Sequence, residues 1–228
     1  MFSQQYWYVG VVSVFIITLE VLAAIFASRH KWVARILLWC MAVFTLVYEI
    51  YYYVTHPTSM PIAFSTFSYF FFCIAVFLPV RPIKSAAAFC SFLSGIIYLG
   101  AFVFYPDANF RAQPDELGRT VGYTLHNMML FGGLLLYSRC KVKKTDVIYI
   151  IGFFIFVAVY SEVAMRVFGN GNVNPITSGA IEATLIHQVA PNFVIKWWWY
   201  LLWYPLVAAI FWGMWELTLF INRRLLRQ

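Results

Sequence analysis

The sequence predicts an all-α polytopic membrane protein, a single domain over residues 1–228 that contains seven transmembrane helices. Two observations predict this class. Hydrophobic residues make up 63% of the chain and charged residues 11%, a composition far from that of soluble domains. Apolar stretches of about 20 residues, the length that crosses ~30 Å of hydrocarbon, recur along the whole chain. They leave no segment long enough for a separate soluble domain.

The expected spans follow the apolar stretches and end at charged residues, prolines or polar loops. The first span has no basic segment before it and no small-residue cleavage site after it, so we expect a retained helix rather than a signal peptide. The seven spans are, in order, Tyr6–Ala27, Trp32–Val54, Pro61–Val80, Ser85–Tyr105, Val121–Ser138, Val147–Phe168 and Trp197–Ile221.

The distribution of lysine and arginine predicts the orientation. Twelve of the 16 basic residues lie in alternate connections and in the tail, and four lie at the opposite face. The positive-inside bias then predicts an outside amino terminus and a cytoplasmic carboxyl terminus. The twelve are Arg29, Lys31, Arg35, Arg81, Lys84, Arg139, Lys141, Lys143, Lys144, Arg223, Arg224 and Arg227; the other four are Arg111, Arg119, Arg166 and Lys196.

The net charge of +7 is interpreted as a topology signal, because the basic residues lie beside membrane ends rather than on a folded basic face. This distribution argues against nucleic acid as a partner and for contact with anionic membrane lipids. A protein partner or a homo-oligomer stays open. The four cysteines show no CxxC spacing, and no disulfide, metal site or cofactor is expected.

Four polar residues from different spans lie in one layer of the expected bundle. Counted at ~1.5 Å per residue from the outer ends, Glu49, Ser65, His126 and Glu162 lie roughly 6 to 9 Å deep. Titratable side chains are costly inside a membrane, so each is a functional candidate, with structural pairing as the alternative. Arg166 lies four residues after Glu162 and faces the same side of that helix, where the two side chains can pair.

These residue types suit acyl transfer. An imidazole activates a hydroxyl by taking its proton, and an acid orients the imidazole; Ser65, His126 and Glu49 supply the three groups. Thr66 points about 100° away from Ser65 around the helix, so we expect only one of the two hydroxyls to face His126. The residues expected to contact substrate are Asn127, Glu162, Arg166, Thr66 and Tyr123.

The segment MPIAFSTFSYFFFCIAVFLPVRPIKSAAAFCSFLSGIIYLGAFVFYPD at residues 60–107 resembles the central region of YwaF-type seven-helix membrane proteins. Their animal relatives include a transmembrane phospholipid acyltransferase. In that family a Leu-Pro-Leu-His-Leu-Cys motif opens the third span and its cysteine is the nucleophile. The resemblance places Ser65 at the cysteine and Ala63 at the histidine of that motif. It also matches His126 in YTLHNMM and Glu49 in LVYEIYYY to polar residues of the fifth and second spans.

Two departures from the family are visible. Serine is a weaker nucleophile than cysteine near neutral pH, so Ser65 would depend more strongly on His126. GNGNVN at residues 169–174 is similar to a Gly-x-Asn-Tyr motif of the family but lacks the tyrosine. Membrane hydrolases of the androgen-induced-gene type use a threonine and histidine pair, which keeps Thr66 as an alternative nucleophile.

The expected function is an intramembrane acyltransferase or lipid hydrolase that acts on a phospholipid or lipid ester from the outer leaflet. The alternative is a transporter or a substrate-binding membrane subunit whose polar layer binds a small solute. Microbial rhodopsins are excluded, because the last span contains no lysine to hold retinal. The compact loops favour a bacterial cytoplasmic (inner) membrane.

Overall fold

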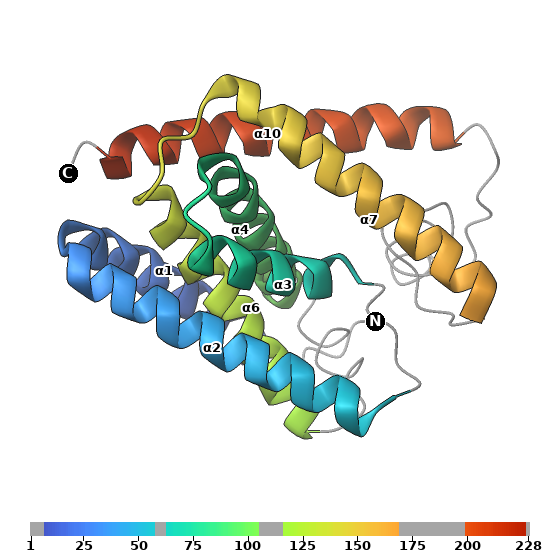
Figure 1. Cartoon of the computed structure of the whole chain (residues 1–228), viewed down its shortest axis with the longest axis horizontal. Helices are drawn as coiled ribbons and strands as arrows, with labels where there is room; N and C mark the ends of the chain where they lie inside the picture. Colours follow the sequence, from blue (N-terminus) through green and yellow to red (C-terminus); the bar gives the residue numbers. More distant parts are fainter. Residues whose placement is uncertain (1–6, 58–62, 105–115, 169–198, 227–228) are drawn as a thin grey trace.

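The computed structural model describes residues 7–57, 63–104, 116–168 and 199–226, and all regular structure in these ranges is helical (Figure 1). The prediction of an all-α chain is therefore confirmed for this part of the molecule. The helices are α1 (Trp7–Arg29), α2 (Lys31–Thr55), α3 (Phe64–Phe77), α4 (Arg81–Phe104), α6 (Glu116–Tyr137), the 3₁₀ turn η1 (Lys144–Asp146), α7 (Val147–Phe168) and α10 (Trp199–Leu226).

Each α-helix coincides with one expected span to within a few residues. By length and composition, five helical segments can cross a membrane. These are Trp7–Arg29, Lys31–Thr55, Arg81–Phe104, Lys144–Ser161 and Pro205–Leu225. The described part of α3 has only 14 residues, about 21 Å of helix, and α6 is not among the five, so the count of seven spans stays a prediction.

Proline sets the boundary between α3 and α4. The helix α3 ends at Phe77, and Leu78 adopts an extended conformation with φ −96° and ψ 128°. A residue before proline avoids the helical region because the ring clashes with its backbone, and Pro79 follows Leu78 directly. Pro82 then occupies the first turn of α4, where its missing N–H costs no hydrogen bond. The expected third span, which ran to Val80, is therefore shortened.

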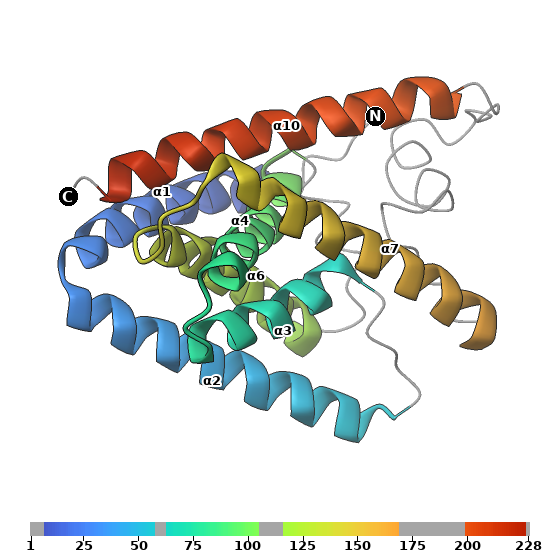
Figure 2. The same ribbon diagram turned by 45° about the horizontal axis from the view of Figure 1, so that its top comes forward.

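The helix α4 lies at the centre of the bundle and contacts α1, α3, α6, α7 and α10. Figure 2 shows it surrounded by these neighbours. Sixty-one per cent of its apolar stretch is buried, against 17% for α1 and 22% for Pro205–Leu225. Small side chains at residues 85–88 are fully buried, and small residues let membrane helices approach closely.

The helices α4 and α6 touch through two glycines. A Cβ atom on Gly95 of α4 would lie 2.5 Å from the backbone nitrogen of Leu130 and 2.8 Å from the carbonyl oxygen of His126. A Cβ atom on Gly133 of α6 would lie 2.7 Å from the backbone nitrogen of Phe92. No larger residue fits at either position without a shift of backbone, so these glycines fix the distance between the two helices.

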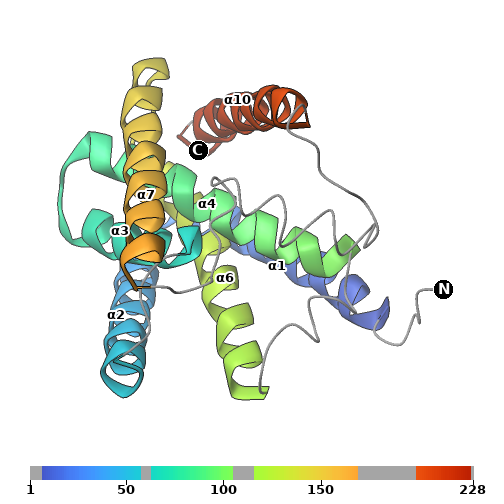
Figure 3. The same ribbon diagram turned by 90° about the vertical axis from the view of Figure 1, so that its right-hand side faces the viewer.

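The outer helices present large apolar side chains to their surroundings. On α1, Phe15 and Phe26 are more than 60% exposed, and Ile155 and Val159 of α7 are also exposed. Figure 3 shows α7 and α10 at the periphery of the bundle. A monomeric soluble protein rarely exposes so much contiguous apolar surface, whereas lipid tails cover it in a membrane.

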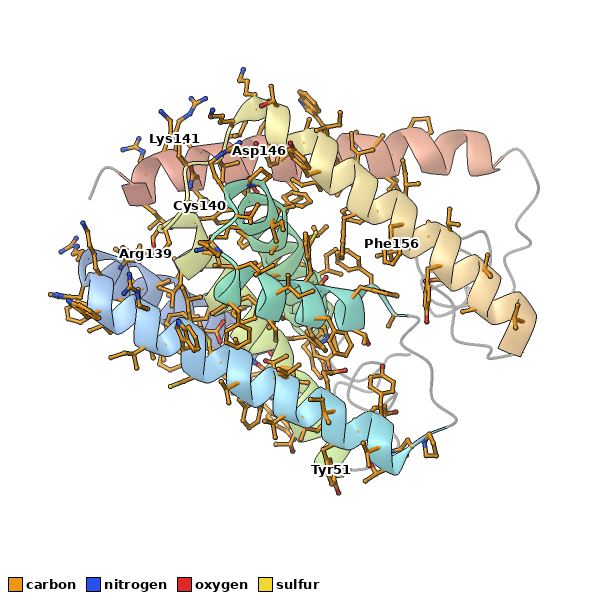
Figure 4. All side chains as sticks on the ribbon, in the orientation of Figure 1. Tyr51, Arg139, Cys140, Lys141, Asp146 and Phe156 are labelled. Carbon is orange, nitrogen blue, oxygen red and sulfur yellow. The ribbon has the colours of Figure 1, made fainter. Side chains whose placement is uncertain are left out.

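Four chain segments meet at one end of the bundle, which we call the basic end: the α1–α2 turn, the α3–α4 turn, residues 138–146 between α6 and α7, and the last turns of α10. The Arg81 guanidinium forms an ion pair with Asp146 at 2.7 Å. The amide of Asn222 donates to the carbonyl oxygens of Tyr137 and Cys140 at 2.6 and 2.8 Å. Figure 4 shows Arg139, Cys140, Lys141 and Asp146 at this end. Asn222 thereby caps the carboxyl end of α6, whose last carbonyls have no partner within the helix.

Candidate polar site between α3, α4 and α6

The imidazole of His126 is held by three side chains from the two neighbouring helices. His126 lies on α6 and is 7% exposed. Its Nδ1 lies 3.4 Å from the hydroxyl of Ser94 on α4. Its ring stacks on Tyr98 of α4 with centroids 3.7 Å apart, and the ring of Tyr69 on α3 meets it edge-on at 5.6 Å. The close approach of α4 and α6 at Gly95 brings Ser94 and Tyr98 to this position.

Tyr69 connects the expected nucleophile with the imidazole. The side chain of Tyr69 interacts with that of Ser65, one helical turn earlier on α3. Ser65 is half-buried. Within the described residues Ser65 and His126 share Tyr69 as a neighbour, but no hydrogen bond joins them directly. The expected pair of Ser65 and His126 therefore stays a prediction. A direct hydrogen bond between them requires the Ser65 side chain to rotate, or α3 and α6 to shift when substrate binds.

The carboxyl group of Glu49 lies on the α2 side of the same cluster and is 5% exposed. Its charge acts on Tyr69 and Cys73 of α3 and on Tyr53 of its own helix. Cys73 donates to the carbonyl oxygen of Ala42 at 3.3 Å, which holds α3 against α2. Glu49 therefore lies near Tyr69, which also contacts the imidazole.

Thr66 faces a different neighbour from Ser65. Its side chain interacts with Tyr53 of α2, consistent with the 100° rotation between consecutive helical residues. Of the two hydroxyls, Ser65 is the one that interacts with Tyr69. The threonine alternative is thus directed toward α2.

Two of the expected substrate contacts lie on the α1 side of α6. The hydroxyl groups of Tyr123 and Ser13 are 3.0 Å apart, which ties α6 to α1. The Asn127 amide donates to the Tyr123 carbonyl oxygen at 2.7 Å, while its own Oδ1 is buried without a hydrogen bond in the described structure. This oxygen is an unbonded acceptor on the α1 side of α6.

The remaining expected contacts, Glu162 and Arg166, lie on α7, and their side chains fall outside the described residues. The neighbouring Tyr160 packs edge-on against Phe67 of α3, with centroids 5.1 Å apart. This part of α7 therefore lies along α3. The glycine and asparagine motif at residues 169–174 lies outside the described ranges.

Sequence analysis missed the side chains that contact His126. Ser94 and Tyr98 are four residues apart on α4, a spacing that places both on one helix face. The neighbouring Gly95 was an available signal, because a glycine within an apolar helix often marks close approach of another backbone. Among the described residues no group of three His, Cys, Asp or Glu side chains could hold a metal ion.

Comparisons with protein-family models, with curated proteins and with solved structures return no match to this chain. The similarity to YwaF-type proteins thus rests on the motifs alone. The function must be argued from the polar site itself.

Proposed function

We propose that this chain is an intramembrane acyltransferase or lipid hydrolase that acts on a lipid ester. The observation that carries the proposal is the position of His126, a buried imidazole with its Nδ1 3.4 Å from a serine hydroxyl and its ring in contact with Tyr69, which lies near a second serine, Ser65. A histidine buried among hydroxyl groups suits proton transfer to and from an alcohol oxygen.

In the proposed reaction a serine oxygen attacks the ester carbonyl while the imidazole takes the hydroxyl proton. The ester C–O bond then breaks, and the leaving alkoxide receives that proton from the imidazolium. Water or an acceptor alcohol attacks the acyl-serine in the second half, again with its proton passing to the imidazole, which returns it to the serine oxygen. Asn127 and Glu49 are the proposed groups that contact substrate and orient the site.

Two serines compete for the role of nucleophile. Ser65 is the residue that the motif resemblance assigns, and it lies beyond Tyr69 from the imidazole. The hydroxyl proton of Ser94 has the shorter path to the imidazole, because the Ser94 oxygen lies 3.4 Å from Nδ1 of His126. We keep Ser65 as the nucleophile expected from the sequence and propose Ser94 as its competitor, which a pair of variants can separate.

The proposal includes seven spans with an outside amino terminus, in a bacterial inner membrane. Its support is the basic end, where the four chain segments that carry most of the basic residues meet through side-chain contacts. An odd number of crossings brings these alternate connections to one side, as the positive-inside bias requires. Because α6 begins at Glu116 rather than at Val121, His126 lies midway along its helix, and the proposed reaction therefore requires the lipid ester to enter below the headgroup level.

Turnover of a phospholipid with a fluorescent acyl chain tests the proposal. In the purified, detergent-solubilised protein, H126A should lower the rate of acyl release at least ~100-fold, the usual contribution of a general base. S65A and S94A identify the nucleophile. Their matched controls are S68A and S91A, which remove buried hydroxyls from the same two helices and should leave the rate unchanged. A wild-type rate in H126A would remove this histidine from the reaction.

The alternative function is binding or transport of a small solute. The absence of a direct hydrogen bond between Ser65 and His126 among the described residues favours it. In that case no acyl release is measured with any lipid ester, and H126A weakens binding of the solute instead.

A further inference from the structure

The basic end contains an arginine whose guanidinium is only partly bonded. Arg139 follows the last turn of α6, and its Nη2 approaches the carbonyl oxygen of Ser28 on α1 at 3.5 Å, which is at the limit of a hydrogen bond. Its Nε is buried without a hydrogen bond in the described structure. A guanidinium carries five N–H donors, so most of the donors of Arg139 have no protein acceptor among the described residues.

A second arginine lies near the first. The contact with Ser28 places Arg139 at the turn between α1 and α2, and Arg35 lies on the first turns of α2. Burial and the like charge of Arg35 lower the pKa of Arg139. The guanidinium of Arg35 lies over the ring of Trp32, 5.2 Å from its centroid. That indole is 73% exposed, as is usual for tryptophan at the level of lipid headgroups.

No acidic side chain compensates this pair. The one ion pair among the described residues joins Arg81 to Asp146, so that carboxylate is already bonded to another cation. The neighbouring turn between α1 and α2 adds Arg29 and Lys31, which increase the positive charge. An anion can bind between two arginines, because each planar guanidinium group can donate two parallel hydrogen bonds to phosphate oxygens.

We propose that Arg35 and Arg139 form a binding site for one phosphate group at the junction of α1, α2 and α6. The phosphate comes either from the headgroup of an anionic phospholipid or from free inorganic phosphate. Figure 4 shows Arg139 beside the α1 and α2 ends of the molecule. Arg35 and Arg139 donate to the phosphate oxygens, and Trp32 lies beside the glycerol region of a bound lipid. The site is independent of the proposed reaction at His126, which lies midway along α6.

Ligand-dependent thermal stabilisation tests the site. The full chain, in the nonionic detergent dodecyl maltoside at ~0.15 M salt, is titrated with dioctanoyl phosphatidylglycerol, with dioctanoyl phosphatidylcholine and with inorganic phosphate. A ligand that binds only the folded protein raises the unfolding temperature. We expect stabilisation by phosphatidylglycerol or by inorganic phosphate, and much less by phosphatidylcholine, whose choline cation meets two arginines.

The variant R35Q/R139Q should weaken the apparent affinity at least ~10-fold, because it removes charge-assisted hydrogen bonds. The matched control is R223Q/R224Q on α10, which removes the same charge from exposed arginines, one of which also lies over an aromatic ring. The control should change the affinity less than ~2-fold, because exposed charges outside the site are screened by salt.

Three results would overturn the site: wild-type affinity in R35Q/R139Q, an equal loss in the control, or equal stabilisation by phosphatidylcholine. R35Q alone keeps the test valid if the double variant does not fold, since Arg35 is exposed and its loss should weaken binding ~5-fold. Stabilisation by inorganic phosphate with the same dependence on both arginines would assign a free anion as the ligand. Stabilisation by phosphatidylglycerol alone would assign the lipid headgroup.

Discussion

Two buried polar side chains of this bundle, Asn222 and His126, differ in how completely they are bonded. At the basic end, Asn222 is 2% exposed and uses both polar atoms of its side chain, donating to two carbonyl oxygens and accepting from the backbone N–H of Val142 at 3.1 Å. Near α3, His126 is nearly as buried, yet its contact with Ser94 is long and the Asn127 oxygen has no bond in the described structure.

This difference separates two uses of buried polarity. Fully bonded groups stabilise one arrangement of the chain, since breaking them exposes several unsatisfied partners at once. Incompletely bonded groups in a membrane interior are costly and mark sites that bind or react. The cluster around Asn222 thus serves the fold, and the cluster around His126 is the candidate for chemistry.

The largest expected effect concerns the two asparagines. N222A leaves two carbonyl oxygens and one N–H unsatisfied, so it should lower the free energy of unfolding by ~3 kcal/mol. N127A removes one hydrogen bond to a backbone carbonyl and should cost ~1 kcal/mol. Urea or guanidinium unfolding in detergent, followed by tryptophan fluorescence, measures both. Equal costs would contradict the distinction between the clusters.

Glycine substitutions on α4 test the His126 cluster separately, because a larger residue at the contact between α4 and α6 displaces the side chains around His126 and leaves the basic end in place. G95A introduces a Cβ 2.5 Å from a backbone nitrogen of α6 and should cost ~2 kcal/mol. G100A, with no heavy atom within 4 Å of the new Cβ, should be neutral or stabilising by ~0.5 kcal/mol. Thermal unfolding in detergent compares the variants, and a destabilising G100A would show that helix propensity is not the governing term.

The smallest expected effect is a change in the rate at which the Cys140 thiol is labelled. Burial raises the pKa of its thiol to about 12, so at pH 8 the thiol keeps its proton and is nearly unreactive. Cys40 is exposed but lies within the second span, where detergent tails cover it, and it is replaced to remove background labelling. In a C40S background, N222A should raise the rate of Cys140 labelling roughly 10-fold, because local opening then costs less. Unchanged labelling would mean that Asn222 does not hold this connection.

The helices could be predicted from the sequence because hydrophobic length, charged boundaries and prolines determine them locally. The burial order of the helices could not. The apolar faces of α1 and α7 look as suitable for a core as those of α4, since lipid tails and protein interiors are equally apolar. The small residues from Ser85 to Ala88 were the available signal for the central helix.

The candidate site shows the same limit. Counting residues from the membrane surface gives the depth of Ser65 and His126, but not the direction in which each points around its helix. That direction depends on which helices touch, and here the contact at Gly95 brings Ser94, rather than Ser65, next to the imidazole. The roles of the two serines, and of Glu162 and Arg166, stay predictions.

The most direct test of the central claim is covalent labelling by a fluorophosphonate, in which an activated serine oxygen bonds to phosphorus and fluoride leaves. Mass spectrometry of the peptides locates the label. In the wild-type protein we predict one labelled serine, either Ser65 or Ser94. The label should be absent from H126A. It should remain in the control H56A, which removes an exposed histidine at the end of α2. Labelling that persists in H126A, or no labelled serine at all, would contradict the proposed chemistry.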